Sequence, residues 1–286
     1  MQFAIDLLRN GKGVLLAGLL VALLTGCGGG SDNGDTGNPN PPPAAPPDDG
    51  DDDDDDDDDG DDGNDDDGDD GGDNTGATFS NFQAASLVIG QQDFSGGDPD
   101  QGGTAPGANT LGLPAGGVDY ADAEDVFFVN DSANARTLGF LGIPDTNNAN
   151  ADFVLGQPDF VQSSPKVAEP GGMISPEAVS IGNGNLMITD TDRNRVAVYD
   201  GVPTAGGAAP VLAIGQSGVA TNPPEGGCNA TTLVHPHDHF VAEDGKVLVA
   251  DAGNNRVLVW NAMPAESGAP ADFALGQIDL ANCSAA

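Results

Sequence analysis

Basic residues are scarce in this chain, which has 8 Lys or Arg against 46 Asp or Glu and a formal net charge of -38. Because the phosphate backbone repels so acidic a protein, nucleic acid is excluded as a partner. Much of the charge comes from one block, in which 19 of the 26 residues from 48 to 73 are Asp. Such a block buries no apolar area and its charges repel one another, so residues 28–77 are predicted to form a disordered Pro-rich, then Asp/Gly-rich linker.

Long hydrophobic runs are also missing, and the apolar run at 13–24 is too short to span a bilayer comfortably. It follows two basic residues and ends in Leu-Thr-Gly-Cys at residues 24–27, an order typical of a bacterial lipoprotein signal. An ordinary signal peptide with a chance cysteine is the alternative. Residues 1–27 are therefore predicted to be a signal segment, with Cys27 lipidated and anchored in a membrane. By resemblance to enterobacterial sorting, Gly28 rather than Asp after Cys27 favours the outer membrane.

Recognisable catalytic motifs are missing from the rest of the chain. There is no Ser-His-Asp spacing, nucleophile elbow, phosphate-cradling glycine loop or discernible pair of catalytic carboxylates. The glycine-rich runs lie between predicted strands with no helix after them, which excludes a dinucleotide site. No segment shows a sustained helical period. These absences favour an all-β protein that is not an enzyme.

What the chain does have is a unit of about sixty residues that recurs along its second part. Three markers return in the same order, which indicates one supersecondary unit copied along the chain. Residues 78–286 are long enough for one domain. The markers are Gly-Gln at 90–91, 156–157, 215–216 and 276–277, Asp-x-x-x-x-Arg at 131–136, 190–195 and 251–256, and an apolar residue before proline at 143–144, 202–203 and 263–264.

Each unit contains four short apolar stretches separated by turns rich in Gly, Asn and Asp. This pattern predicts an antiparallel meander of four strands. A further strand at 86–90 precedes the first unit and matches the fourth strand of a unit. The predicted strands are 116–120, 125–130, 136–141 and 152–156, then 176–181, 186–190, 195–199 and 210–215, then 237–241, 246–250, 256–260 and 272–276.

Four-stranded meanders at a fixed period are typical of β-propeller blades. The stretch 249–260, with Pro236 upstream, resembles an NHL repeat, and the copies around Asp190 and Asp131 are similar. The resemblance covers 85–280 and implies a β-propeller-type fold with three NHL-like blades. Three blades do not close a ring. Part of a longer propeller, a half ring that pairs as a homodimer and an open stack all remain open, although unpaired edges disfavour the stack.

Cysteine is rare, and apart from Cys27 the chain has only Cys228 and Cys283. An even pair in the oxidising cell envelope favours a disulfide. The two lie 55 residues apart, close to one repeat, so loops of adjacent units would bring them together. Two free buried thiols are the alternative.

The Asp-x-x-x-x-Arg marker is predicted to be scaffolding, because a single active site needs no threefold copy. An Asp that ends a strand can accept backbone N–H bonds in the following turn, Asn suits the left-handed position there, and Arg can bridge to an Asp of the same or the next blade. A ring of ligand contacts is the alternative. The marker residues are Asp131, Arg136, Asp190, Asn194, Arg195, Asp251, Asn255 and Arg256.

The chain's three histidines are His235, His237 and His239. Alternate residues of a strand share a face, and imidazole is a ligand for zinc or copper. The NHL resemblance implies that this strand lines the central channel, where some lyases of this fold hold a metal. A structural role is favoured, because alternate residues lie about 7 Å apart and cannot all reach one ion unaided.

These features favour an envelope lipoprotein whose acidic linker presents the blades as a binding module. Its partner would be a protein, a peptide or a glycan, contacted through the long inter-blade loops. One alternative is a metal-dependent enzyme of the propeller lyase or lactonase kind that uses the histidine face. Another is a structural half ring that assembles with a copy of itself. Binding ranks first because no constellation in the sequence requires catalysis.

Overall fold

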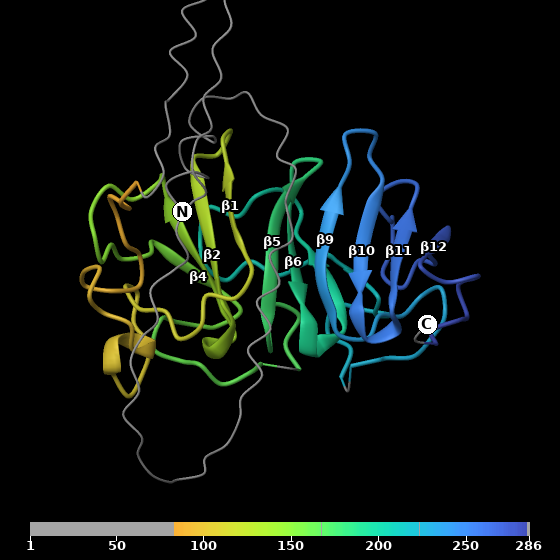
Figure 1. Cartoon of the computed structure of the whole chain (residues 1–286), viewed down its shortest axis with the longest axis horizontal. Coiled ribbons are helices and arrows are strands. Elements are labelled where there is room, and N and C mark those ends of the chain that lie inside the picture. The colour runs from red at the N-terminus through yellow and green to blue at the C-terminus, as the bar shows by residue number, and fades with distance from the viewer. Residues whose placement is uncertain (1–82, 167, 223, 285–286) are drawn as a thin grey trace, which may run out of the picture. The chain divides into compact units, whose positions relative to one another are not determined.

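The computed structural model describes residues 83–284, except 167 and 223. The predicted signal segment, Cys27 and the linker at 28–77 lie outside the described residues. The described part is all-β and contains three four-stranded antiparallel sheets placed side by side (Figure 1). Within it, no helix has the length and apolar character needed to cross a membrane.

Each sheet is a meander whose four strands pair in chain order, which confirms the predicted all-β, propeller-type blades. The three sheets, called blades 1 to 3, do not close into a ring within the described residues. Blade 1 comprises β1 (Val118–Ala121), β2 (Val126–Asp131), β3 (Arg136–Leu141) and β4 (Phe153–Leu155). Blade 2 comprises β5 (Pro176–Gly182), β6 (Asn185–Asp190), β7 (Arg195–Val198) and β8 (Leu212–Ile214). Blade 3 comprises β9 (Pro236–Val241), β10 (Val247–Asp251), β11 (Arg256–Trp260) and β12 (Phe273–Leu275).

A short 3-10 turn joins the second and third strands of every blade. These turns are η2 (Ser132–Asn134), η3 (Thr191–Arg193) and η4 (Ala252–Asn254), and a fourth, η1 (Pro99–Gly102), precedes blade 1. The residue after each turn has a left-handed backbone, with φ of 50° at Ala135, 52° at Asn194 and 54° at Asn255. Asn tolerates this conformation better than most residues, and Asn194 and Asn255 occupy it as predicted, whereas Asn134, predicted to occupy it in blade 1, lies within the turn and Ala135 takes the position.

The core lies between the blades, because alternate residues of each strand point to opposite faces of its sheet. We call the face toward the next blade in the chain the downstream face, and the opposite face the upstream face. Between blades 1 and 2, Phe128 and Phe153 pack edge to face with ring centroids 6.0 Å apart. Between blades 2 and 3, Met187 and Leu212 pack with Trp260. Each inter-blade core therefore needs two blades.

The upstream face of blade 1 is covered by the segment that precedes it. Ile89 and Leu111 of this segment are buried against Phe127 and Phe140. The strand predicted at 86–90 does not form, because the segment has no neighbouring strand of its own to pair with. Its Val88 instead exchanges bonds with a loop of blade 1, including a 3.1 Å bond from the N–H of Asn148 to the Val88 carbonyl.

Candidate functional site

The repeated aspartates bind backwards along the chain, to the segment that enters the first strand of their own blade. The Oδ1 atom of Asp190 accepts N–H bonds of 3.0 Å from both Ile174 and Ser175. Asp131 and Asp251 make the corresponding bonds in blades 1 and 3. The backbone donors therefore lie before the blade and not, as predicted, in the following turn, although the side-chain amides of Asn134 and Asn254 in that turn do donate to Asp131 and Asp251. The actual partners lie 15 to 19 residues earlier and meet the Asp only when the blade folds.

The second oxygen of each aspartate holds the repeated arginine of the same blade. The Nε–Oδ2 distance is 2.9 Å for Arg136 and Asp131 and 2.8 Å for Arg256 and Asp251. In blade 2, Arg195 reaches Asp190 through Nη2 at 3.2 Å. All six side chains are almost completely buried. Each ion pair lies inside one blade and none bridges to the next.

Each arginine also joins the loop that enters its blade to the loop that leaves it. In blade 3, Arg256 donates to the carbonyls of Asn229 and Thr232 before the blade, and to that of Leu280 after it. The corresponding carbonyl acceptors are Gly107, Thr110 and Phe160 for Arg136, and Pro170, Gly172 and Val219 for Arg195. Because backbone carbonyls occupy the guanidinium donors, the repeated Asp and Arg have a structural role and form no ring of ligand contacts. We call each Asp–Arg pair, with the two loops that it joins, the clamp of its blade.

Blade 2 buries a second arginine that the repeat did not predict. Arg193 is 1% exposed and donates to carbonyls, including that of Gly172 at 2.5 Å. Burial, and then the neighbouring Arg195, lower the pKa of Arg193 to about 10. Asp190 is the only buried carboxylate of blade 2 in the described chain, so the backbone supplies most of the stabilisation for these two cations.

The Gly-Gln marker locks the end of each fourth strand to the left-handed turn. Gly215 has a φ of 87°, and an added Cβ there would lie 2.5 Å from Leu233. The amide nitrogen of Gln216 donates to the carbonyl of Asn194 at 3.0 Å. Glycine is needed at this position because any other residue would be strained at this positive φ, and its Cβ would clash with Leu233.

His239 lies inside the boundary between blades 2 and 3. Its Nε2 is 2.7 Å from Ser180 Oγ, and its Nδ1 is 2.7 Å from Thr189 Oγ1. Burial lowers the pKa of His239 to about 4, so the imidazole is neutral at physiological pH. A Ser-His contact is the start of a nucleophile-base pair, but the third group here is a hydroxyl rather than the carboxylate that orients an imidazole. The arrangement joins two blades.

The other two histidines lie at the surface and face carboxylates of blade 2. His235 Nδ1 is 3.7 Å from Asp192, and His237 Nδ1 is 3.8 Å from Glu177. The pairing register of β9 with β10 shifts beside His237, because Pro236 pairs with Asp251 and Asp238 with Ala250. A bulge of this kind interrupts the alternation of side chains. The three imidazoles thus have separate partners.

A metal site is not built by these residues. Among the residues that the structure describes, no three His, Cys, Asp or Glu side chains form a group that could hold an ion. A polar hollow of about 230 Å³ lies in the loop that contains Asp93, Asp98 and Gln101. It lacks the apolar lining typical of a small-molecule site.

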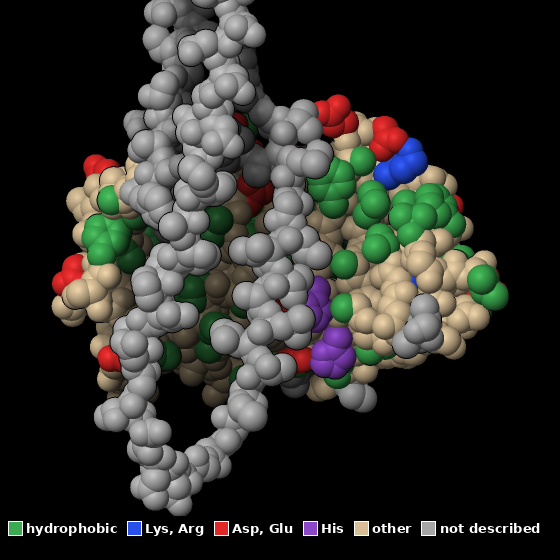
Figure 2. Space-filling view, in the orientation of Figure 1, with side chains coloured by type: hydrophobic (Ala, Val, Ile, Leu, Met, Phe, Trp, Pro, Cys, Tyr) green, Lys and Arg blue, Asp and Glu red, His purple; other side chains and the backbone are tan. Residues whose placement is uncertain are grey.

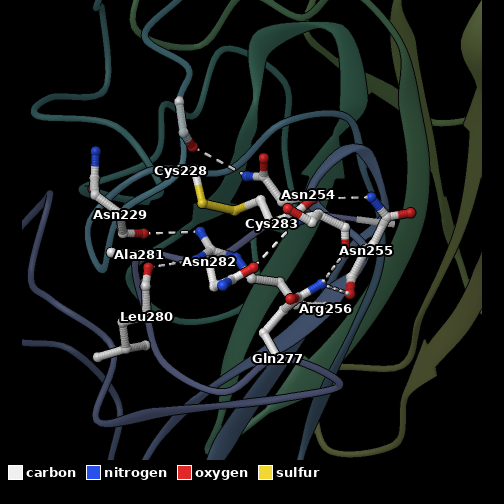
Figure 3. Close-up of a disulfide and its surroundings, with 12 residues drawn as sticks. Cys228, Asn229, Asn254, Asn255, Arg256, Gln277, Leu280, Ala281, Asn282 and Cys283 are labelled. Atoms are coloured by element: carbon white, nitrogen blue, oxygen red, sulfur yellow. Dashed lines mark hydrogen bonds between the residues drawn. A yellow bond between two sulfur atoms is a disulfide. The ribbon is translucent and has the colours of Figure 1, made fainter. Parts of the chain in front are cut away.

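Cys228 and Cys283 form a disulfide in the structure, with Cα atoms 6.0 Å apart (Figure 3). The bond links the loop before blade 3 to the segment after it. Arg256 lies beside it and donates to the carbonyls of Asn229 and Leu280, each one to three residues from a cysteine (Figure 3). The disulfide and the clamp therefore hold the same two segments together.

Two hydroxyls that connect neighbouring blades were not predicted. Ser132 of blade 1 donates to the carbonyl of Pro176, and Thr191 of blade 2 donates to that of Pro236 at 2.7 Å. Both residues directly follow the repeated Asp, and this shared position in the repeat is the sequence signal that could have predicted the two links. Asp119 adds a further link, since its carboxylate accepts the N–H of Ile181 at 2.7 Å, and burial is the main cause that raises its pKa.

The burial of the arginines makes the outside of the domain strongly acidic. Residues 83–284 contain 24 Asp or Glu and six Lys or Arg, and the four arginines are all buried. Lys166 and Lys246 are the remaining cations of the described chain, and Lys246 is paired with Asp244. Most of the carboxylates are not buried. A surface of one sign attracts partners of the opposite sign.

Comparisons with known proteins give likenesses of structure alone. No family model matches the sequence, and no curated protein matches it. Among solved structures, the chain is similar to the WD40 β-propeller domain of Doa1, with 12% identity, a TM-score of 0.34 and coverage of 57% of this chain and 42% of that one. Virginiamycin B lyase from Staphylococcus aureus matches with 10% identity, a TM-score of 0.30 and coverage of 52% and 39%. A streptogramin B lyase matches with 8% identity, a TM-score of 0.30 and the same coverage. The chain thus spans about two fifths of the length of these structures, and likenesses of this strength assign it no activity.

Proposed function

We propose that this chain is an envelope lipoprotein, anchored through Cys27, that presents NHL-type blades as a binding module for a positively charged protein or peptide. The acidic segment at 28–77 would act as the tether between the membrane and the blades. The outer membrane is the proposed location. The observation that carries the proposal is the negative charge of the domain surface, where most carboxylates are exposed to solvent and the arginines are buried.

The residues of the described chain that could carry chemistry have structural roles instead. The repeated Asp and Arg side chains are buried and bonded inside each blade, and His239 is bonded on both ring nitrogens. What remains available is the loop surface, including the exposed acids Asp122, Glu124 and Glu266. Loops held by a rigid scaffold are the usual place for recognition.

A protein or peptide partner fits this surface better than a glycan. Sugar rings are commonly held against exposed Trp or Tyr rings, but Trp260 and Tyr199 are 3% and 1% exposed, and the exposed large aromatics of the described chain are the phenylalanines Phe94, Phe240 and Phe273. They pack between blades. The metal-dependent lyase or lactonase alternative gains no support from the separate positions of the three histidines.

The proposal is tested with two nine-residue peptides, one of alternating Val and Lys and one of alternating Val and Glu. Their affinities for the detergent-purified chain would be measured by calorimetry at about 0.05 M and 0.3 M salt. A variant that lacks residues 48–73 separates the blades from the acidic segment. We expect this variant to bind the Lys peptide at least tenfold more tightly than the Glu peptide, and less tightly in high salt because salt screens surface charge. Equal affinities would reject the proposal.

A further inference from the structure

We propose that the partner binds along the outer edge of β4, the fourth strand of blade 1. A positively charged, extended segment of the partner would pair with this edge as an added strand. The inference rests on the proposed function, because it gives the positively charged partner a place and a mode of binding. It follows from a comparison of the three loops that join the third and fourth strands of the blades. We call these loops straps 1 to 3, at residues 143–151, 202–210 and 263–271.

Strap 3 covers the outer edge of blade 2. The Oγ atom of Ser267 accepts the N–H of Ala213, the middle residue of β8, at 3.0 Å. The N–H of Gly268 donates to the carbonyl of the same residue at 3.3 Å. The N–H and carbonyl of Ala213 are thereby occupied, and an edge strand that is covered in this way is protected from pairing with another chain.

Strap 1 makes the same two bonds to the segment before blade 1. Asn147 Oδ1 accepts the N–H of Val88 at 3.0 Å, and the N–H of Asn148 donates to the Val88 carbonyl at 3.1 Å. The three straps share a left-handed backbone at this point, with φ of 58° at Asn148, 83° at Gly207 and 72° at Gly268. The bonds are therefore part of the repeat, and one of them needs an oxygen-bearing side chain just before the left-handed residue.

A further bond ties straps 1 and 3 to the loop that enters their own blade. The N–H of Ala151 donates to the carbonyl of Ala108 at 2.9 Å, and the N–H of Ala271 donates to that of Ala230 at 2.8 Å. Strap 2 has Pro210 at the equivalent position, and proline has no N–H to donate. Strap 2 therefore lacks this anchor.

Strap 2 also lacks the bonds to the strand that it covers. The counterpart of Ala213 in β4 is Val154, because both residues have the same register with the third strand of their blade. Gly206 stands where straps 1 and 3 have Asn147 and Ser267, and it has no side chain to accept an N–H. An added Cβ at Gly206 would lie 3.2 Å from the carbonyl oxygen of Val154. Within the described chain, no hydrogen bond joins strap 2 to Val154 or to any residue outside the strap.

The contacts that hold strap 2 are apolar, so it can leave the edge of β4 at a small cost. Val202 and Ala208 are partly buried against the core between blades 1 and 2. Gly206, Gly207 and Ala209 are exposed. Segments with few buried contacts and no protected backbone bonds open locally with a low free energy. An opened edge strand offers its N–H and C=O groups to an extended peptide.

The charges near this edge are acidic, which favours a positively charged partner. Asp152 directly precedes β4 and is exposed, and Asp200 is exposed just before strap 2. Neither β4 nor strap 2 contains a Lys or Arg. Figure 2 shows acidic side chains at several places on the visible face, and basic ones gathered at its upper right. A second copy of this chain would bring the same acidic surface to the contact, so like charges oppose self-association.

Gly206→Ser is the closing variant, because it gives strap 2 the hydroxyl with which Ser267 covers β8. We expect it to weaken binding of the Val/Lys peptide at least tenfold, under the conditions given above, without lowering the melting temperature. Gly97→Ser is the control, because an added Cβ there meets no atom within 4 Å and the residue lies before blade 1. It should leave the affinity unchanged.

Hydrogen exchange gives a second measurement that needs no substitution. The Val/Lys peptide at saturation should slow exchange of the Val154 amide at least tenfold, because this amide donates to the added strand. The Ala213 amide should not change, because Ser267 already accepts its hydrogen bond.

Unchanged exchange at Val154, with unchanged affinity in Gly206→Ser, would overturn the docking site and leave the proposed function standing. Equal binding of the Val/Lys and Val/Glu peptides, with Val154 protected by both, would overturn the positive charge of the partner in the inference and in the proposed function alike. A dimer in light scattering that Gly206→Ser abolishes would show that a second copy pairs with the edge, and would also overturn the inference.

Discussion

His239 of blade 3 and Thr189 of blade 2 are joined across the blade boundary by a 2.7 Å contact between Nδ1 and Oγ1. Ser180 makes the same contact with the other ring nitrogen. The imidazole can donate from one nitrogen and accept at the other only while it is neutral. The link between the two blades therefore depends on the protonation state of one buried side chain.

Stability should fall below neutral pH because of His239. Its folded pKa of about 4 lies below the ordinary value of 6.5, so between these values the unfolded chain binds a proton that the folded chain does not. The contribution is complete above pH 6.5 and is lost as the pH falls toward 4. From this group alone we expect a loss of about 2 kcal/mol between pH 7 and pH 5.

The matched variant is His239→Val, because Val179 occupies the equivalent position in blade 2. Urea unfolding at both pH values would give the free energies. The difference between wild type and variant should shrink at pH 5, since carboxylates titrate alike in both proteins. Parallel pH curves for the two proteins would contradict this account.

Asp251→Ala should be among the most damaging single substitutions. It leaves Arg256 buried without its ion pair and removes the acceptor for the N–H of Val234. Removal of one partner of a buried pair costs about 3–5 kcal/mol. Glu266→Ala is the control, because Glu266 is exposed and should change the unfolding free energy by less than about 0.5 kcal/mol. Equal melting temperatures for the two variants would mean that the clamp does not hold the blade.

Local features of the blades could be predicted from the sequence, and contacts between distant segments could not. The strand predicted at 186–190 is observed at Asn185–Asp190, because alternating apolar residues between two turns specify a strand. By contrast, Asp131 bonds to the N–H of Gly112, 19 residues earlier. No local pattern encodes that approach, which depends on how the blade closes.

The histidines show the same limit in the candidate site. Alternation along a regular strand puts His235, His237 and His239 on one face. In the structure they are separated by the bulge beside His237 and by the contacts of His239 with the hydroxyls of Ser180 and Thr189 on blade 2. Pro236 was the signal for this irregularity, because proline in a sheet is confined to edge strands, first residues of a strand or bulges. Ala135 is a smaller case, since the repeat predicts Asn at a left-handed position where blade 1 has alanine.

Loss of the disulfide should loosen blade 3. Cys228 and Cys283 close a loop of 55 residues, and a crosslink of this kind stabilises by about 2–4 kcal/mol, mainly by restricting the unfolded chain. The double variant Cys228→Ser/Cys283→Ser should therefore melt at a lower temperature than the oxidised wild type. Reductant should lower the melting temperature of the wild type and leave the variant unchanged. A variant that melts like the oxidised protein would show that Arg256 alone holds the two segments.

Tyr199→Phe should stabilise the protein. The Tyr199 hydroxyl is buried and has no hydrogen-bond partner among the described residues, and burial raises its pKa. The equivalent residue of blade 3, Trp260, satisfies its indole N–H with the carbonyl of Ala269, whereas blade 1 has Phe140 and no polar atom to satisfy. An unpaired buried hydroxyl costs about 1–3 kcal/mol, so its removal should raise the unfolding free energy by about 1 kcal/mol. Trp260→Phe is the opposite control, because it removes a bonded donor and leaves the Ala269 carbonyl unpaired. A Tyr199→Phe protein that unfolds more easily than wild type would show that the hydroxyl is bonded in solution.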